Sequence, residues 1–218
     1  MHTGGLVLWQ SGQASAAEEI NAWVRHLMLC ATAPEGVELR TTLVDDAGGV
    51  VFVAERDLPS PPEAEASGIE DESGRASDGA EVAPDEGRRT LDREYARERL
   101  ADLVRLYARG LREPVPFFPK SAFAYAKAAA KAGGLYPDTV KKAGRNAAFD
   151  KWKGNSYGSK PTKGEREDAW LRVAFRGHPD PVIDVRDEFA NLARRVLGPM
   201  LAWRVQAGPS RDDEGSAA

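Results

Sequence analysis

A long stretch that cannot bury a core divides this chain and limits every architecture it can adopt. From Leu58 to about Arg89 the residues are mostly Pro, Glu, Ala, Ser, Gly and Asp, with almost no bulky apolar side chain. Such a composition cannot offset the entropy that a chain loses on ordering. We therefore predict a disordered acidic insertion at residues 58–90 within one domain formed by residues 1–57 and 91–205. A tether between two separate lobes fits the same pattern.

The composition is typical of a soluble globular protein. The chain has 218 residues, of which 42% are apolar and 29% charged, and no run approaches the roughly 18 apolar residues that a membrane helix needs. We expect a cytoplasmic protein without membrane contact and with a disordered tail at 206–218. A single cysteine, Cys30, excludes an internal disulfide, and His2, His26 and His178 lack the spacing of metal ligands, so no metal site is expected.

The first block predicts a small β structure with one helix. Leu6–Trp9 is typical of a short buried strand, and the runs Glu38–Val44 and Val50–Val53 flank a glycine turn and predict a hairpin. Between these strands, Ser15 and Glu18 have the spacing of a capping box. Apolar residues at helical spacing then predict one buried face, made of Ile20, Trp23, Val24, Leu27 and Met28.

The second block predicts mainly helices. Its expected helices are residues 92–109, 122–132 with Ser121 as the cap, 137–153 and 189–201. Residues 168–176 fit either a helix or a strand, of which we favour the helix. The first should bury a face of Leu100, Leu103, Val104, Tyr107 and Leu111. Gly154–Gly164 is predicted to be a polar loop, and Pro199 is predicted to kink the last helix.

The charge is unevenly distributed, which matters more than the net charge of −4. Residues 120–163 contain ten Lys and Arg against two acids, whereas residues 59–90 contain nine acids against three basic residues. Basic helix faces interleaved with aromatic rings are typical of single-strand binding. The candidate DNA-binding residues are Lys120, Lys127, Lys131, Lys141, Lys142 and Arg145, and the interleaved rings are Tyr125, Tyr136, Trp152 and Tyr157. An ordinary solvated helix face with core aromatics is the simpler alternative.

A rigid proline and aromatic segment connects the first two of these helices. Pro114, Pro116 and Pro119 fix the backbone, so the segment follows a defined path. One ring of Phe117 and Phe118 is expected to anchor it to the core. The other ring, with Pro116 and Pro119, is a candidate partner-binding patch, so the candidate set is Pro116, Phe117, Phe118 and Pro119.

The usual sequence signs of catalysis or nucleotide binding are missing. No serine lies in a G-x-S-x-G elbow, and no phosphate loop is present. Cys30 lies in an apolar run, where a buried thiol is more usual than a nucleophile. We expect no catalytic residue and no bound cofactor in this chain.

Several motifs, taken together in their order along the chain, resemble the C-terminal domain of the exodeoxyribonuclease V gamma subunit, RecC. The resemblance covers about residues 4–53 and 91–203. Its motifs are Leu6–Trp9 with Gly12, Ile20–Ala31, Leu103–Tyr125, Phe149, Trp152, the acidic Gly164–Asp168, Trp170–Gly177 and Phe189–Leu201.

The resemblance implies a PD-(D/E)xK nuclease-like three-layer α/β fold without the catalytic residues. It implies a non-catalytic, DNA-handling and scaffolding role in recombinational repair of double-strand breaks. The implied partners are forked or single-stranded DNA, the helicase-nuclease beta subunit and the helicase alpha subunit. ATP and Mg would be bound by those subunits of the ATP-dependent helicase-nuclease complex. The chain lacks the upstream helicase-like domains, so it looks like the C-terminal piece alone. It would then work alone, join a separately encoded remainder, or be a truncated reading frame.

Two alternatives stay open at this stage. The first is a protein-interaction module that docks a helicase subunit through Pro114–Pro119 without contacting DNA. The second is an active nuclease dependent on Asp138 or Asp180. It is disfavoured because Asp184-Val-Arg186 follows Asp180 too closely for two strands, and arginine cannot replace the lysine of a D/E-x-K motif.

Overall fold

The computed structural model describes residues 4–55, 91–132, 137–155, 162–178, 180–184 and 186–206. The predicted insertion and all but the first residue of the predicted tail lie outside these residues. The strands are β1 (Leu6–Trp9), β2 (Arg40–Val44), β3 (Val50–Val53), β4 (Gly154–Asn155), β5 (Thr162–Lys163) and β6 (Arg204–Gln206). The helices are α1 (Ala16–Thr32), α2 (Arg93–Gly110), α3 (Pro119–Lys131), α4 (Pro137–Lys153), α5 (Ala169–Ala174), α6 (Pro181–Asp184) and α7 (Arg186–Trp203), with a short 3₁₀ helix, η1 (Glu165–Glu167).

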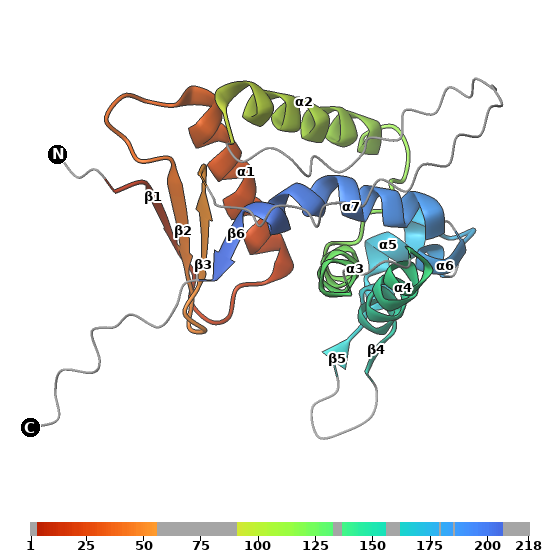
Figure 1. Ribbon diagram of the computed structural model, residues 1–218. Helices are drawn as coiled ribbons and strands as arrows, with labels where there is room; N and C mark the ends of the chain where they lie inside the picture. The colour runs from red at the N-terminus through yellow and green to blue at the C-terminus, as the bar shows by residue number, and fades with distance from the viewer. Residues whose placement is uncertain are drawn as a thin grey trace, which may run out of the picture.

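The fold is a mixed α/β arrangement with a small sheet at one end and mostly helices elsewhere (Figure 1). The main sheet has the order β1-β2-β3-β6, with β1 parallel to β2 and the other neighbours antiparallel. The predicted hairpin is confirmed as β2 and β3, and positive φ angles of Gly48 and Gly49 form its turn. The predicted polar loop instead contains the short antiparallel pair β4 and β5.

Strand β6 was not predicted, and it adds a strand from the second block of the chain to the sheet of the first block. It follows α7 directly and pairs with β3, so strands from either side of the acidic segment share one sheet. The side chain of Arg204 in β6 donates to Glu19 of α1 across 2.9 Å, and both side chains are largely covered. This ion pair fixes the end of α7 against α1.

Helix α1 covers one face of the sheet. Register places Leu43, Val50 and Phe52 on the face that packs against α1. The opposite face exposes Val7 and Trp9, the latter by 74%. The prediction that β1 is a buried strand is therefore wrong, because Val7 and Trp9 are exposed and Leu6 and Leu8 are only partly buried. Among the described residues, no helix lies on the face of the sheet opposite α1 (Figure 1).

Helix α1 begins as predicted but buries a shifted face. Ser15 and Glu18 form the capping box, and Trp23 and Leu27 are buried, whereas Met28 is exposed. His26 is buried in its place. Its Nδ1 lies 3.1 Å from the hydroxyl of Thr41 in β2, and its Nε2 lies 3.6 Å from the thiol of Cys30.

Burial of His26 predicts a pH-dependent stability. Burial lowers the pKa of His26 to about 4, against an opposing backbone hydrogen bond with Val53. Above pH 6.5 both the folded and unfolded states hold a neutral imidazole, so His26 adds no pH dependence. Between about pH 6.5 and 4 only the unfolded state gains the proton. The free energy of unfolding should therefore fall by about 3 kcal/mol over this range as the pH is lowered, and His26 should cause no further loss below pH 4.

Urea unfolding of the chain from pH 7.5 to 4 checks this expectation. The matched variant is His26→Phe, which keeps an aromatic ring between Trp23 and Phe52 but cannot titrate. The wild-type protein should lose about 3 kcal/mol more than this variant over the range. Parallel pH profiles for the two proteins would contradict a neutral buried His26.

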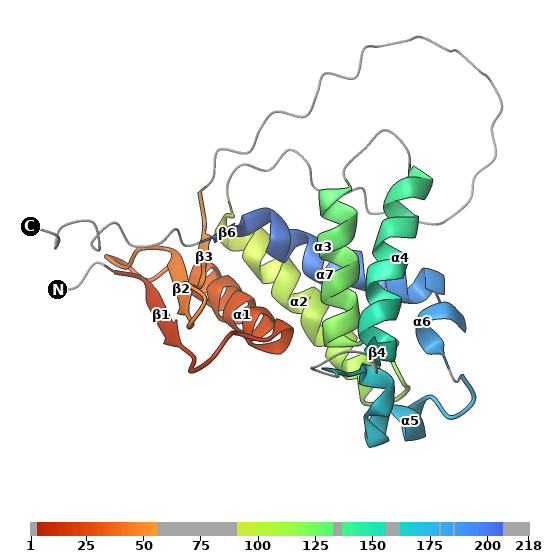
Figure 2. The ribbon, with the colours of Figure 1, turned by 90° about the horizontal axis from the view of Figure 1, so that it is seen from below.

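The helical end is built around α3, α4 and α7. Helices α3 and α4 run side by side in opposite directions, and α7 extends from this pair to the sheet (Figure 2). Helix α4 has the predicted bounds. Helix α7 continues through Pro199 to Trp203. Helix α2 packs on α1, but Val104, Tyr107 and Leu111 of its predicted buried face are exposed.

Helix α3 begins three residues earlier than predicted and has a different cap. Pro119 is its first residue, and Phe118 at the N-cap position provides no side-chain bond. Glu165 of η1 instead accepts from the backbone N–H groups of Lys120 at 2.9 Å and Ser121 at 2.7 Å. The Ser121 hydroxyl also donates to Glu165, at 2.6 Å. The prediction of Ser121 as the cap is wrong, because the chain is already helical there.

In the described residues no helix is long and apolar enough to cross a membrane.

Candidate nucleic-acid interface

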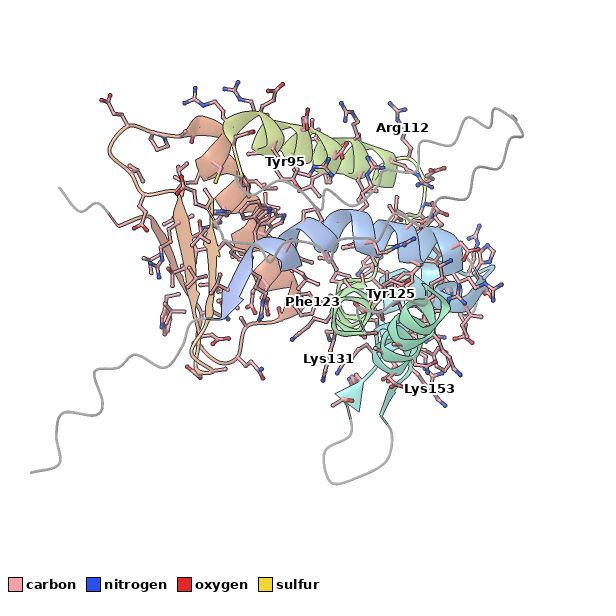
Figure 3. All side chains as sticks on the ribbon, in the orientation of Figure 1. Tyr95, Arg112, Phe123, Tyr125, Lys131 and Lys153 are labelled. Atoms are coloured by element: carbon pink, nitrogen blue, oxygen red, sulfur yellow. The ribbon has the colours of Figure 1, made fainter. Side chains whose placement is uncertain are left out.

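The six candidate DNA-binding residues do not form one continuous face. Lys120, Lys127 and Lys131 fall within about 40° of one another around α3, and all three are exposed. We call these three residues the α3 lysine face. Tyr125 lies on the side of α3 toward α4 and α7, whereas Lys131 lies on the outer side (Figure 3). The Lys127 ammonium lies 5.4 Å from the centre of the Phe123 ring, a cation–π distance that holds the side chain along the helix.

Lys141 and Arg145 lie on a second surface, which also includes α7. Together with residues of α7 they line a surface hollow of about 240 Å³, which we call the α4–α7 hollow; its lining is Tyr125, Lys141, Arg145, Asp187, Ala190, Asn191 and Arg194. Lys142 points about 100° away from Lys141 around α4 and is exposed outside the hollow. The hollow combines three cations with one carboxylate.

Close packing between α3 and α4 shapes this hollow. A Cβ atom at Gly144 would lie 2.8 Å from the Tyr125 ring, so only glycine allows this approach without displacement. The Tyr125 ring also meets Phe189 of α7 edge-on, with centroids 5.9 Å apart. Since α4 and α7 both pack on α3, the buried Tyr125 ring lies between them at the base of the hollow.

The interleaved aromatic residues within the described chain belong to the core. Tyr125 and Trp152 are 1% and 3% exposed, so neither ring is available to stack on a base. The indole N–H of Trp152 donates to Asp180 at 3.1 Å. Tyr136 and Tyr157 lie outside the described residues. For Tyr125 and Trp152 the simpler core interpretation is therefore correct.

The proline segment anchors itself through Phe118. The Phe118 ring is fully buried and lies 4.7 Å from Trp152, 5.2 Å from Phe175 and 5.9 Å from Phe189 between ring centroids. Pro116 is also buried, while Phe117 and Pro119 are half-buried. The exposed part of the candidate partner-binding set is thus limited to Phe117 and Pro119.

The described residues contain no cluster of metal ligands. Among them no group of three or more His, Cys, Asp or Glu side chains could hold a metal ion. Asp180 is bonded to Trp152, and Asp184 ends α6 rather than lying on a strand. The side chain of Asp138 lies outside the described residues. Burial raises the pKa of the Cys30 thiol to about 12, so it is a poor nucleophile.

Sequence reasoning missed the α7 wall of the hollow and the Glu165 cap. Asp187, Asn191 and Arg194 recur at i, i+4 and i+7, which places them on one helix face, but nothing in that spacing indicates which helix lies opposite. Arg194 donates to the amide oxygen of Asn191 at 2.7 Å. These residues come together only because α3 brings α4 and α7 to the same place.

Comparison with known proteins identifies the family. A search of curated proteins found no match for the chain. The family model of the RecC C-terminal domain matches residues 1–130, which include β1–β3, α1, α2 and nearly all of α3. Of the residues that line the α4–α7 hollow, only Tyr125 lies within the matched residues. The match covers more than half of the chain and confirms the resemblance seen in the sequence, so the chain belongs to the RecC C-terminal domain family.

Proposed function

We propose that this chain is a non-catalytic, DNA-handling and scaffolding part of an exodeoxyribonuclease V (RecBCD-type) helicase-nuclease that acts in recombinational repair of double-strand breaks. Membership of the RecC C-terminal domain family indicates a role in such a complex. The proposal includes a fold related to the PD-(D/E)xK nucleases without their catalytic residues. Its proposed partners are forked or single-stranded DNA and the beta and alpha subunits of the complex, which would supply ATP hydrolysis and cleavage.

The observation that carries the DNA part of this proposal is the α3 lysine face. Lys120, Lys127 and Lys131 project from one side of a helix whose opposite side is packed into the core. None of the three has a carboxylate partner among the ion pairs within the described residues. Such lysines can neutralise phosphates and release condensed counterions.

The salt dependence of DNA binding tests this proposal. If about four cations contact a single strand, the logarithm of the affinity should fall with the logarithm of the salt concentration with a slope of about −3. Fluorescence anisotropy of a labelled oligothymidylate across a salt series measures this slope. Replacing Lys127 and Lys131 by alanine should make the slope shallower by about 1.4.

The control removes equal charge elsewhere. Arg172→Ala with Arg176→Ala removes two exposed cations on and after α5 and should leave the slope unchanged. Wild-type binding that does not respond to salt would remove the DNA part of the proposal.

The second candidate function is a protein-interaction module that docks a helicase subunit without DNA contact. The observation that favours it is the exposed apolar row of Val104, Tyr107 and Leu111 on and just after α2, directly before the proline segment. Phe117→Ser, which spares the buried Phe118 ring, tests docking through this segment. Affinity purification of the tagged wild-type chain should recover the beta and alpha subunits. Loss of both subunits with Phe117→Ser would support docking through the proline segment.

A further inference from the structure

The α4–α7 hollow has the chemistry of a phosphate site, and nothing in the family match assigns it. We infer that the hollow binds a phosphodiester group of a single nucleic-acid strand through Lys141, Arg145 and Arg194. This inference rests on the proposed DNA contact and specifies one place where it occurs. The argument depends on charge, on unsatisfied donors and on shape.

The charge in the hollow is only partly balanced. Lys141, Arg145 and Arg194 line it with a single carboxylate, that of Asp187. Asp187 is 80% exposed, and its oxygen lies 3.5 Å from Arg145, the limit of a hydrogen bond. An exposed pair of this length contributes little. The cations therefore retain most of their capacity to attract an anion.

The donors in the hollow outnumber the acceptors. The Nε atom of Arg145 is buried and has no hydrogen-bond partner in the described part of the chain, so the guanidinium depends on its single long contact with Asp187. The amide oxygen of Asn191 accepts from Arg194, so this amide can offer a ligand only its NH₂ donor. A ligand suited to this lining must be rich in acceptors and negatively charged, as a phosphate is.

The shape of the hollow fits a chain rather than a bare ion. Its volume of about 240 Å³ holds several water molecules, which exceeds the space that one small anion fills. Its walls come from i, i+4 residues of α4 and i, i+4, i+7 residues of α7, so its cations come from two helices. A phosphodiester can enter with its flanking sugars, whereas these walls provide no exposed ring for a base, since Tyr125 is buried.

Two opposite substitutions test the site by anisotropy of a labelled oligothymidylate bound to the full chain. Arg194→Ala should weaken binding about tenfold at moderate salt and make the salt slope shallower by about 0.7. Asp187→Asn should strengthen binding about threefold, because among the described lining residues it removes the one carboxylate that competes with phosphate. Arg172→Ala and Asp150→Asn, which change the same charges on exposed residues outside the hollow, should match the wild type.

The outcomes separate this inference from the proposed function. If the wild-type chain binds no DNA, both fail. If the wild type and the α3 lysine variants behave as expected but Arg194→Ala and Asp187→Asn equal the wild type, the hollow is not a phosphate site and the proposed function stands. If Arg194→Ala weakens the binding of polyglutamate but not of the oligonucleotide, the hollow binds acidic peptide, and the inference is overturned.

Discussion

Phe118→Ala should lower the free energy of unfolding by about 4 kcal/mol, because it removes a fully buried ring and leaves a cavity. The Phe118 ring contacts Trp152 of α4, Phe175 after α5 and Phe189 of α7. The Phe118 ring therefore connects α4, α7 and the residue after α5. Among the ring contacts between described residues, no other ring contacts all three. Thermal or urea unfolding followed by circular dichroism measures the change.

The neighbouring ring is the matched control for this experiment. Phe117 has the same side chain and lies one residue earlier, but it is only half-buried against the core. Phe117→Ala should cost about 1 kcal/mol. Equal losses at the two positions would show that Phe118 does not anchor the segment. They would also reopen the question of which ring is available to a partner.

Sequence patterns predicted local elements well and long-range contacts poorly, for physical reasons that particular residues show. The capping box of Ser15 and Glu18 and the hairpin turn depend on neighbouring residues, and both are confirmed. Strand β6 has three residues directly after a helix and no alternating pattern of its own. Only its pairing with β3 makes it a strand, and no local preference encodes that partner.

Apolar periodicity predicted the buried side of α2 only in part. Leu100 and Leu103 of the predicted face pack on the core, as does Leu106, whereas Val104, Tyr107 and Leu111 are exposed. The helix has two adjacent apolar rows, and the spacing alone cannot show which row α1 covers. The candidate site shows the same limit of prediction. Its six cations could be chosen from their local spacing, but the hollow depends on how α4 and α7 pack on α3, which local spacing does not indicate.

Glu165→Ala should lower the free energy of unfolding by about 3 to 5 kcal/mol. Its carboxylate accepts from the backbone N–H groups of Lys120 and Ser121 and from the Ser121 hydroxyl. Ser121 is fully buried. Without the carboxylate, three donors at the start of α3 lose their acceptor. Each buried unsatisfied group costs about 1 to 3 kcal/mol, and relaxation of the structure recovers part of this cost. The negative charge at a helix N-terminus is lost as well.

The control is Glu167→Ala, which lies in the same three-residue helix. Glu167 is exposed and accepts one bond, from the Gly164 N–H at 3.1 Å, so its loss should cost less than about 1 kcal/mol. Because Glu165 fixes the start of α3, its variant should also disturb the α3 lysine face and the base of the α4–α7 hollow. Hydrogen exchange should show earlier opening of the Lys120 and Ser121 amides in Glu165→Ala than in Glu167→Ala. Unchanged protection would mean that α3 forms its first turn without the distant carboxylate.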